Sequence, residues 1–269
     1  MLVNFLFYLL IFFMGTLFGS FLTLASYRIP LNQDITHKRS YCPNCNHRLE
    51  FLDLIPLWSY IFLGGKCRYC KKKISSRYFI IELLAGISFI ILALSLRFTI
   101  YNINVINLIE FSLGVLYIVF LFLIGAIDKE HNTIDTRVLI YGIVISLLNV
   151  IYQYNYAKAT LANYNINRVI LYLVAIIILN LINMKVTNKN KQYVINVLIL
   201  LAIMSLFTQE ITTILTIVFT LIEIAFTFII NKIINKGKKA NGKMHVALYL
   251  VASNAILLIY AIYNFYVLI

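Results

Sequence analysis

Residues 104–127 read NVINLIEFSLGVLYIVFLFLIGAI and contain one charged side chain, Glu110. A helix of this length rises about 36 Å at 1.5 Å per residue, which is enough to cross the roughly 30 Å hydrocarbon core of a bilayer. Comparable apolar blocks recur along the chain, separated by short polar stretches. The sequence therefore predicts an all-α integral membrane protein with about eight transmembrane helices, near 2–27, 78–96, 104–127, 136–152, 167–184, 192–208, 211–231 and 245–266.

The composition of the whole chain supports a membrane protein. Of its 269 residues, 62% are apolar and 12% are charged, and the mean hydropathy is +0.89. Soluble domains are about 45–50% apolar and about 25% charged. These values exclude a soluble globular enzyme, a disordered chain, a collagen-like chain and a disulfide-dense fold. The apolar run at 2–27 is too long, and lacks the basic start, for a cleaved signal peptide, so we expect it to be a retained helix.

The basic residues predict the topology. The chain has 23 Lys and Arg residues against 10 Asp and Glu residues, a formal charge of +13. With eight spans, twenty of the basic residues fall in loops on one face, and only Arg97, Lys158 and Arg168 fall on the other. Such an asymmetry marks the cytoplasmic face, so both termini are expected on the opposite side. The positive charge is therefore explained by the topology of a protein in a lipid bilayer, and we expect no nucleic-acid partner.

All four cysteines lie in the expected cytoplasmic loop between the first two helices. They form two C-x-x-C pairs with 21 residues between them. Two such pairs can place four thiolates tetrahedrally around one zinc ion, and cytoplasmic thiols stay reduced. A closed four-thiolate site has a structural role, folding a loop too small for a core of its own. The alternatives are two disulfides or unligated thiols. The predicted zinc ligands are Cys42, Cys45, Cys67 and Cys70, and we expect the nearby His47 to be a solvated loop residue.

Small and aromatic residues suggest how the first helices and their loop are arranged. Gly15, Gly19 and Gly86 are expected to permit close helix packing. Trp58 and Tyr60 suit the aromatic belt at a membrane interface.

The order of several strings then resembles a known family. GSFLTLASYRIP at 19–30, the two cysteine pairs and ISSRYFIIELLAG at 74–86 are similar to the N-terminal half of type IV prepilin peptidases, the leader peptidase/N-methyltransferases of pilus, type II secretion and competence systems. The resemblance is strong over 15–86, fair over 115–137 and only topological beyond. It implies domains at 1–28 (first helix), 29–77 (zinc-binding loop), 78–103 (second helix and outer loop) and 104–269 (six-helix aspartic peptidase-like domain).

The resemblance also implies a catalytic pair of aspartates. Asp128, in the string GAID at 125–128, matches the family's first aspartate. The second belongs in a G-x-G-D motif near residues 188–194, but the chain reads NKNKQYV there, with Gln192 or Tyr193 in the place of the acid. No aspartate follows Asp135. The two-aspartate mechanism needs one ionised and one protonated carboxyl group, so the missing acid matters.

Other polar residues each have a functional and a structural interpretation. Asp135 is a weak candidate for the second acid, and the simpler interpretation is that it caps the helix that follows. Arg28, Arg77 and Glu82 could bind S-adenosylmethionine or the protein substrate; alternatively the arginines anchor helices at the interface and Glu82 forms a helix–helix pair. The sequence identifies no cofactor-binding residue for S-adenosylmethionine.

The resemblance therefore implies a membrane aspartic endopeptidase that removes leader peptides from type IV prepilin-like proteins, and N-methylation of the new terminus if methyltransfer is retained. The alternative is a degenerate, non-proteolytic homologue, because the second catalytic aspartate is absent. A transporter or channel ranks lower, because the second half lacks the proline- and glycine-interrupted helices of such proteins.

Overall fold

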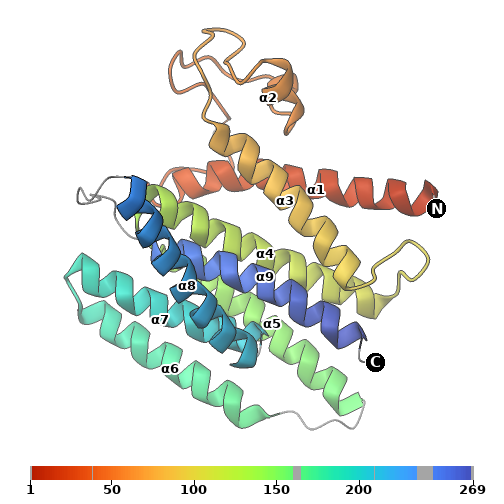
Figure 1. Cartoon of the computed structure of the whole chain (residues 1–269), viewed down its shortest axis with the longest axis vertical. Helices are drawn as coiled ribbons and strands as arrows, with labels where there is room; N and C mark the ends of the chain where they lie inside the picture. The colour runs from red at the N-terminus through yellow and green to blue at the C-terminus, as the bar shows by residue number, and fades with distance from the viewer. Residues whose placement is uncertain (1, 38, 160–164, 209, 235–244, 268–269) are drawn as a thin grey trace. The chain divides into compact units, whose positions relative to one another are not determined.

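The computed structural model describes residues 2–37, 39–159, 165–208, 210–234 and 245–267. These residues form helices and loops, and their only strand-like pairings are two isolated bridges. The fold predicted from the sequence, an all-α membrane protein, is confirmed. The elements, labelled in Figure 1, are α1 (Leu2–Arg28), η1 (Phe51–Asp53), α2 (Trp58–Phe62), α3 (Ser76–Ser95), α4 (Val105–His131), α5 (Thr136–Ala159), α6 (Ile166–Lys185), α7 (Lys189–Thr208), α8 (Glu210–Ile234) and α9 (Val246–Val267).

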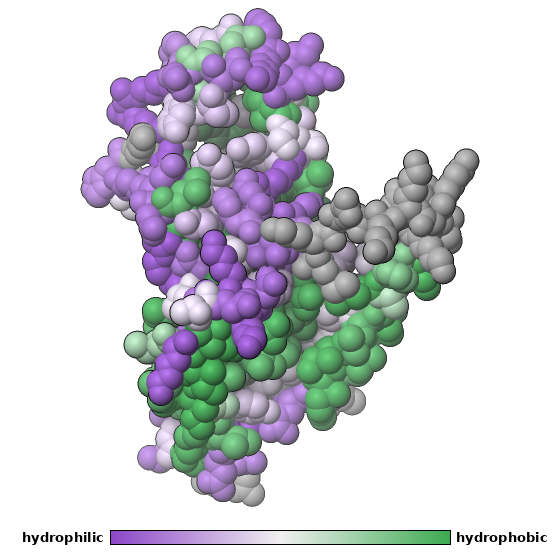
Figure 2. Space-filling model, turned by 90° about the vertical axis from the view of Figure 1, so that its left-hand side faces the viewer, coloured by the Kyte–Doolittle hydropathy of each residue, from purple (hydrophilic) through white to green (hydrophobic). Residues whose placement is uncertain are grey.

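Seven helices of the described part, α1 and α3 to α8, are long and apolar enough to cross a membrane. In α9 the stretch Val246–Tyr260 is equally apolar but shorter. Large apolar side chains such as Leu10, Leu171 and Ile211 are more than 60% exposed, as expected for helix faces that contact lipid. Figure 2 shows hydrophobic side chains over the helices, whereas the part at the top of the picture is mostly hydrophilic.

Several helix boundaries differ from the predicted ones; α4 continues to His131, past 127, and α8 continues to Ile234, past 231. Helix α5 continues to Ala159, past the predicted end at 152. Helix α7 begins at Lys189 rather than 192, because the side chain of Asn188 accepts the amide of Asn190 at 2.9 Å and so starts the helix within its polar turn. The lysine-rich connection expected before the last helix falls at 235–244, outside the described residues.

The chain divides into two compact units, residues 1–115 and 116–269, and helix α4 runs across the boundary. In the first unit α1 packs against α3 (Figure 1). A side chain at Gly19 would place its Cβ 2.7 Å from the Cα of Glu82, and one at Gly15 would place it 2.8 Å from the Cα of Gly86. The predicted close packing through Gly15, Gly19 and Gly86 is confirmed, since no larger residue fits between the two backbones.

The second unit is held together by buried polar side chains as well as apolar ones. Tyr117 donates to Asn254 at 2.7 Å, and Asn254 donates in turn to Thr216 at 3.0 Å. Asn183 donates to Asn196 at 2.8 Å, which links α6 to α7. Hydrogen bonds of this kind help to hold membrane helices together, because the hydrophobic effect does not drive helices to associate within lipid.

We expect Gly19→Ile to destabilise the first unit by about 2 kcal/mol, because the added side chain meets the α3 backbone and forces the helices apart. Thermal unfolding of the purified chain in detergent measures the effect. Leu10→Ile, which places the same side chain on an exposed face of α1, is the matched control. Equal melting temperatures for both variants would show that the close approach of the two helices does not contribute to stability.

Candidate functional site

The two C-x-x-C segments fold into equivalent turns. The amide of Cys42 donates to the carbonyl of His47 at 2.9 Å, and the amide of Cys67 donates to the carbonyl of Lys72 at the same distance. The residue after each second cysteine, Asn46 and its counterpart Lys71, has a positive φ of 56° or 58°. Neither is glycine, so both turns hold a backbone conformation that L residues seldom adopt. We call the loop that carries these turns, residues 29–75, the knuckle loop.

The four sulfur atoms lie together. All four cysteines are free, and their sulfurs are within 4.8 Å of one another. Cys42 Sγ and Cys70 Sγ are 3.9 Å apart. A tetrahedron of sulfurs around zinc with bonds of about 2.3 Å has edges of about 3.8 Å, so the donor set fits a zinc ion. The sequence prediction that these four residues share one site is confirmed, and His47 stands outside the cluster, with its ring against Tyr69 at 3.5 Å.

Hydrogen bonds around the sulfurs prepare them for a cation. Burial opposes ionisation of Cys42, but hydrogen bonds, chiefly from the amide of Cys45, outweigh it and lower the pKa of Cys42. The amide of Lys72 is the main cause that lowers the pKa of Cys70 to about 6. The amide of His47 acts in the same direction on Cys45, yet desolvation and the neighbouring sulfurs raise the pKa of Cys45 to about 11. A divalent cation removes that conflict, because it stabilises all four thiolates at once.

The knuckle loop is also tied together by Asp53. Its carboxylate accepts from Arg68 Nε at 2.6 Å and from the Tyr69 hydroxyl at 3.2 Å. Burial opposes ionisation of Asp53, but the bond from Arg68 outweighs it and lowers the pKa of Asp53. The second cysteine turn is therefore fixed to η1 through one carboxylate.

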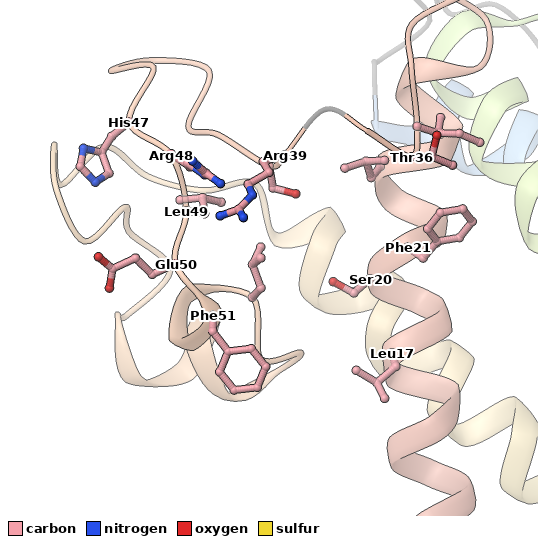
Figure 3. A pocket seen from close by; sticks show the side chains of 14 residues that line it. Leu17, Ser20, Phe21, Thr36, Arg39, His47, Arg48, Leu49, Glu50 and Phe51 are labelled. Carbon is pink, nitrogen blue, oxygen red and sulfur yellow. The ribbon is translucent and has the colours of Figure 1, made fainter.

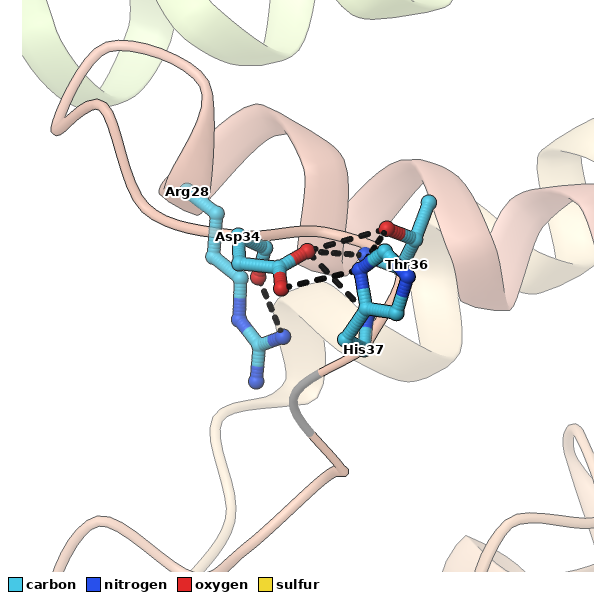
Figure 4. A network of polar contacts seen from close by, with 4 residues as sticks. All are labelled: Arg28, Asp34, Thr36 and His37. Carbon is cyan, nitrogen blue, oxygen red and sulfur yellow. Dashed lines mark hydrogen bonds and ion pairs between the residues drawn. The ribbon is translucent and has the colours of Figure 1, made fainter.

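Arg28 and Glu82 connect the knuckle loop to α1 and α3, and Arg77 connects these two helices to each other. Arg28 is buried, and its Nη1 donates to the carbonyl of Asp34 at 2.9 Å (Figure 4). Arg77 donates to Ser26 at 3.0 Å, which links α3 to α1. Glu82, on α3, accepts the amide of Leu57 at 2.8 Å. These contacts give all three residues a structural role within the first unit.

Asp34 is fixed at the start of the knuckle loop. One of its carboxylate oxygens accepts the amides of Thr36 and His37 at 2.8 and 3.1 Å. These hydrogen bonds, led by that of Thr36, lower the pKa of Asp34. Figure 4 shows the loop closing around this carboxylate beside Arg28.

In the second unit, Asp128 lies near the end of α4 and is fully buried. One of its carboxylate oxygens accepts the hydroxyl of Tyr193 at 3.0 Å, and the other accepts the amide of Leu248 at 3.0 Å. The Tyr193 hydroxyl also accepts the amide of Ala247 at 3.1 Å. His245 Nδ1 lies 2.7 Å from the Asp128 backbone carbonyl. Residues from α4, α7 and the start of α9 therefore meet at one carboxylate.

Tyr193 is one of the two residues, with Gln192, at which the resemblance places the second aspartate, and its hydroxyl donates to Asp128 in the structure. From the sequence, Tyr193 is identified only as a residue in the place of the acid. The contacts of Asp128 with His245 and with the α9 amides have no signal in the sequence, because both join residues more than a hundred positions apart.

Asp135 has a different environment. Its carboxylate accepts the amide of Arg137 at 2.9 Å at the start of α5, and it pairs with the Arg137 guanidinium at 2.8 Å. Burial opposes ionisation of Asp135, but the bond from Arg137 outweighs it and lowers the pKa of Asp135. These contacts are those of a helix cap.

Comparisons with known proteins find one family model and several relatives. Residues 13–96 match the model of the bacterial peptidase A24 N-terminal domain. The chain is 44% identical to a prepilin leader peptidase/N-methyltransferase of Myxococcus xanthus over 84 residues, 31% of this chain and 25% of the relative. It is 33% identical to one of Vibrio cholerae over 150 residues (46% and 58%) and 34% identical to one of Bacillus subtilis over 132 residues (49% and 50%). No solved structure matches.

The matches thus span between a quarter and somewhat more than half of these relatives. The stretch matched by the family model, residues 13–96, includes most of α1, all of α3 and the cysteine cluster. Over these residues the chain is similar to the bacterial peptidase A24 N-terminal domain, and the relatives it resembles are prepilin leader peptidase/N-methyltransferases.

Proposed function

We propose that this chain binds prepilin-like proteins in the bacterial cytoplasmic membrane but does not cleave their leader peptides by a two-aspartate mechanism. The observation that carries the proposal is the hydrogen bond from Tyr193 to the buried carboxylate of Asp128. The similarity over residues 13–96 supports the class of partner.

The chemistry of an aspartic peptidase requires two carboxyl groups that share a proton, so that one activates water and the other polarises the scissile carbonyl. A phenol at position 193 can donate a hydrogen bond to Asp128, but it supplies no second carboxylate. The other Asp128 oxygen is already engaged by the amide of Leu248. Asp135, the weak candidate from the sequence, is engaged by Arg137 and by its helix start.

The cysteine cluster has a structural role in this proposal. Cys42, Cys45, Cys67 and Cys70 would hold a zinc ion, which supplies a crosslink between the two turns of the knuckle loop. Four protein ligands close the site, so the ion has no open position for a substrate. The twenty basic residues on one face favour a cytoplasmic location for this loop.

The Asp128–Tyr193 contact can be measured by a double-mutant cycle. We expect Tyr193→Phe to cost about 1–2 kcal/mol, because a buried carboxylate oxygen loses its donor. Asp128→Asn should also destabilise the chain, and the double variant should cost less than the sum of the two. Thermal unfolding in detergent gives all four values. Strict additivity would contradict a direct interaction between the two side chains.

Removal of one sulfur tests the metal site. Cys42→Ser should reduce bound zinc from about one ion per chain to near zero, because three thiolates cannot close the tetrahedron. Plasma emission spectroscopy on the purified protein measures the metal. His47→Ala, next to the cluster but outside it, should retain the zinc. A metal-free wild type with no thiols reactive toward Ellman's reagent under denaturing conditions would instead favour disulfides.

Leader processing is the direct test of the proposal. The full chain is co-expressed with a prepilin-like protein, and intact mass spectrometry reads the substrate's N-terminus. We expect the leader to be retained with wild type and with Asp128→Asn, while co-purification of tagged wild type with the substrate persists. A Bacillus subtilis relative serves as the active control.

Loss of the leader with wild type but not with Asp128→Asn would show a working peptidase and overturn the proposal. A substrate that is never recovered with the wild-type chain would overturn the binding part. With a substrate made without its leader, and this chain as the only methyltransferase added, a mass gain of one methyl group on the free N-terminus would reveal retained methyltransfer.

A further inference from the structure

The knuckle loop carries an apolar surface that its polar composition does not suggest. In η1, Phe51 is 81% exposed, and in α2, Trp58, Ile61 and Phe62 are 48, 57 and 78% exposed. The rings of Trp58 and Phe62 stack, with their centroids 5.7 Å apart. Exposed aromatic residues that gather on one short segment mark a surface that contacts a partner or a membrane. We call residues 51–62 the aromatic segment.

The contact between Leu57 and Glu82 of α3 indicates the depth of the aromatic segment relative to the bilayer. Arg77 and Arg97 bracket the apolar part of α3, twenty residues or about 30 Å apart, which matches the hydrocarbon thickness of a bilayer. Glu82 is five residues, or about 8 Å, inside Arg77 along the helix. The amide of Leu57, directly before α2, bonds to the Glu82 carboxylate at 2.8 Å. Because helix side chains point back toward the N-terminus, this carboxylate reaches toward the boundary, and Leu57 lies at the interface.

A cavity between the aromatic segment and α1 indicates the same depth relative to the bilayer. It measures about 950 Å³ and lies between α1 and the knuckle loop (Figure 3). Leu17 and Phe21 form its α1 wall, and Phe51 faces them from the loop. Leu17 is 59% exposed and lies about 16 Å from the end of α1 at Arg28, within the lipid-facing part of that helix. The loop therefore folds back beside the transmembrane helix.

Charge favours lipid over a protein partner. Residues 28–77 contain ten Lys and Arg residues against three Asp and Glu residues. Arg39 and Arg48 line the cavity from the loop side (Figure 3). Apolar rings next to a surplus of cations match the interface of an anionic leaflet, where each cation near the surface is attracted by acidic lipid.

We propose that the aromatic segment lies in the headgroup region of the bilayer as a monotopic element, and that acidic phospholipid fills the cavity between it and α1. The segment then fixes the knuckle loop against the membrane surface. The Glu82 contact holds one end of the segment, and the side chains of Trp58, Ile61 and Phe62 hold it by contact with lipid.

The chain provides its own probe, because Trp58 is its single tryptophan. The full-length protein is reconstituted into vesicles of phosphatidylcholine and phosphatidylglycerol, with bromine on the acyl chains near the headgroup or near the methyl end. We expect bromine near the headgroup to quench Trp58 at least about twofold more than bromine near the methyl end, as for an interfacial tryptophan. Acrylamide in the aqueous phase should quench Trp58 weakly.

The control moves the tryptophan to the cysteine turns. Trp58→Phe combined with Lys72→Trp places the reporter at an exposed position of the second turn, where we expect strong acrylamide quenching and little bromine quenching. Ile61→Ser with Phe62→Ser should lower the bromine quenching of Trp58 at least about twofold, by removing apolar contact with lipid. Zinc content, measured in each variant, reports that the loop is folded.

Equal acrylamide quenching of Trp58 and of the Lys72→Trp reporter, without quenching by bromine, would overturn the proposal. Protection of Trp58 only when a prepilin-like protein is added would also overturn it, and would assign the aromatic segment to a protein partner.

Discussion

The structure depends on one constraint: a polar group inside a bilayer has no water, so its hydrogen-bond partner must come from the protein. Asp128 obtains two donors, Tyr193 and the amide of Leu248. Glu82 obtains the amide of Leu57, and Tyr117 obtains the amide oxygen of Asn254. Each of these bonds joins residues far apart in the sequence, so satisfying a polar group and packing the helices are the same event.

The features that could be predicted from the sequence are those with a local signal. Apolar runs such as 104–127 identify membrane helices by length alone, and the C-x-x-C pairs bring Cys42 and Cys67 together because thiolates at that spacing suit one metal. Glycine at position 19 indicates close packing, because glycine is the smallest residue and lets two helix backbones approach each other. The α2 helix was missed, since five residues carry no detectable period.

The features that could not be predicted are long-range contacts to the backbone. Glu82 could have been a ligand for S-adenosylmethionine or a helix–helix partner, but it accepts the amide of Leu57, which looks like any other amide in the sequence. The environment of Asp128 depends likewise on the first amides of α9. The sequence shows Gln192 and Tyr193 where the resemblance places an acid, but only the structure shows that Tyr193 contacts Asp128.

This contact shows how a single carboxylate can be buried without a second acid beside it. Two buried carboxyl groups can share a proton, so removing one leaves the other without its hydrogen-bond partner, which is costly in a membrane. The phenol of Tyr193 replaces that partner with a neutral donor, and the amide of Ala247 fixes the phenol in place. Tyr193 thus supplies Asp128 with a hydrogen bond and no second carboxylate. The burial of Asp128 is therefore accounted for by hydrogen bonds within the protein, whatever the chemical role of this carboxylate.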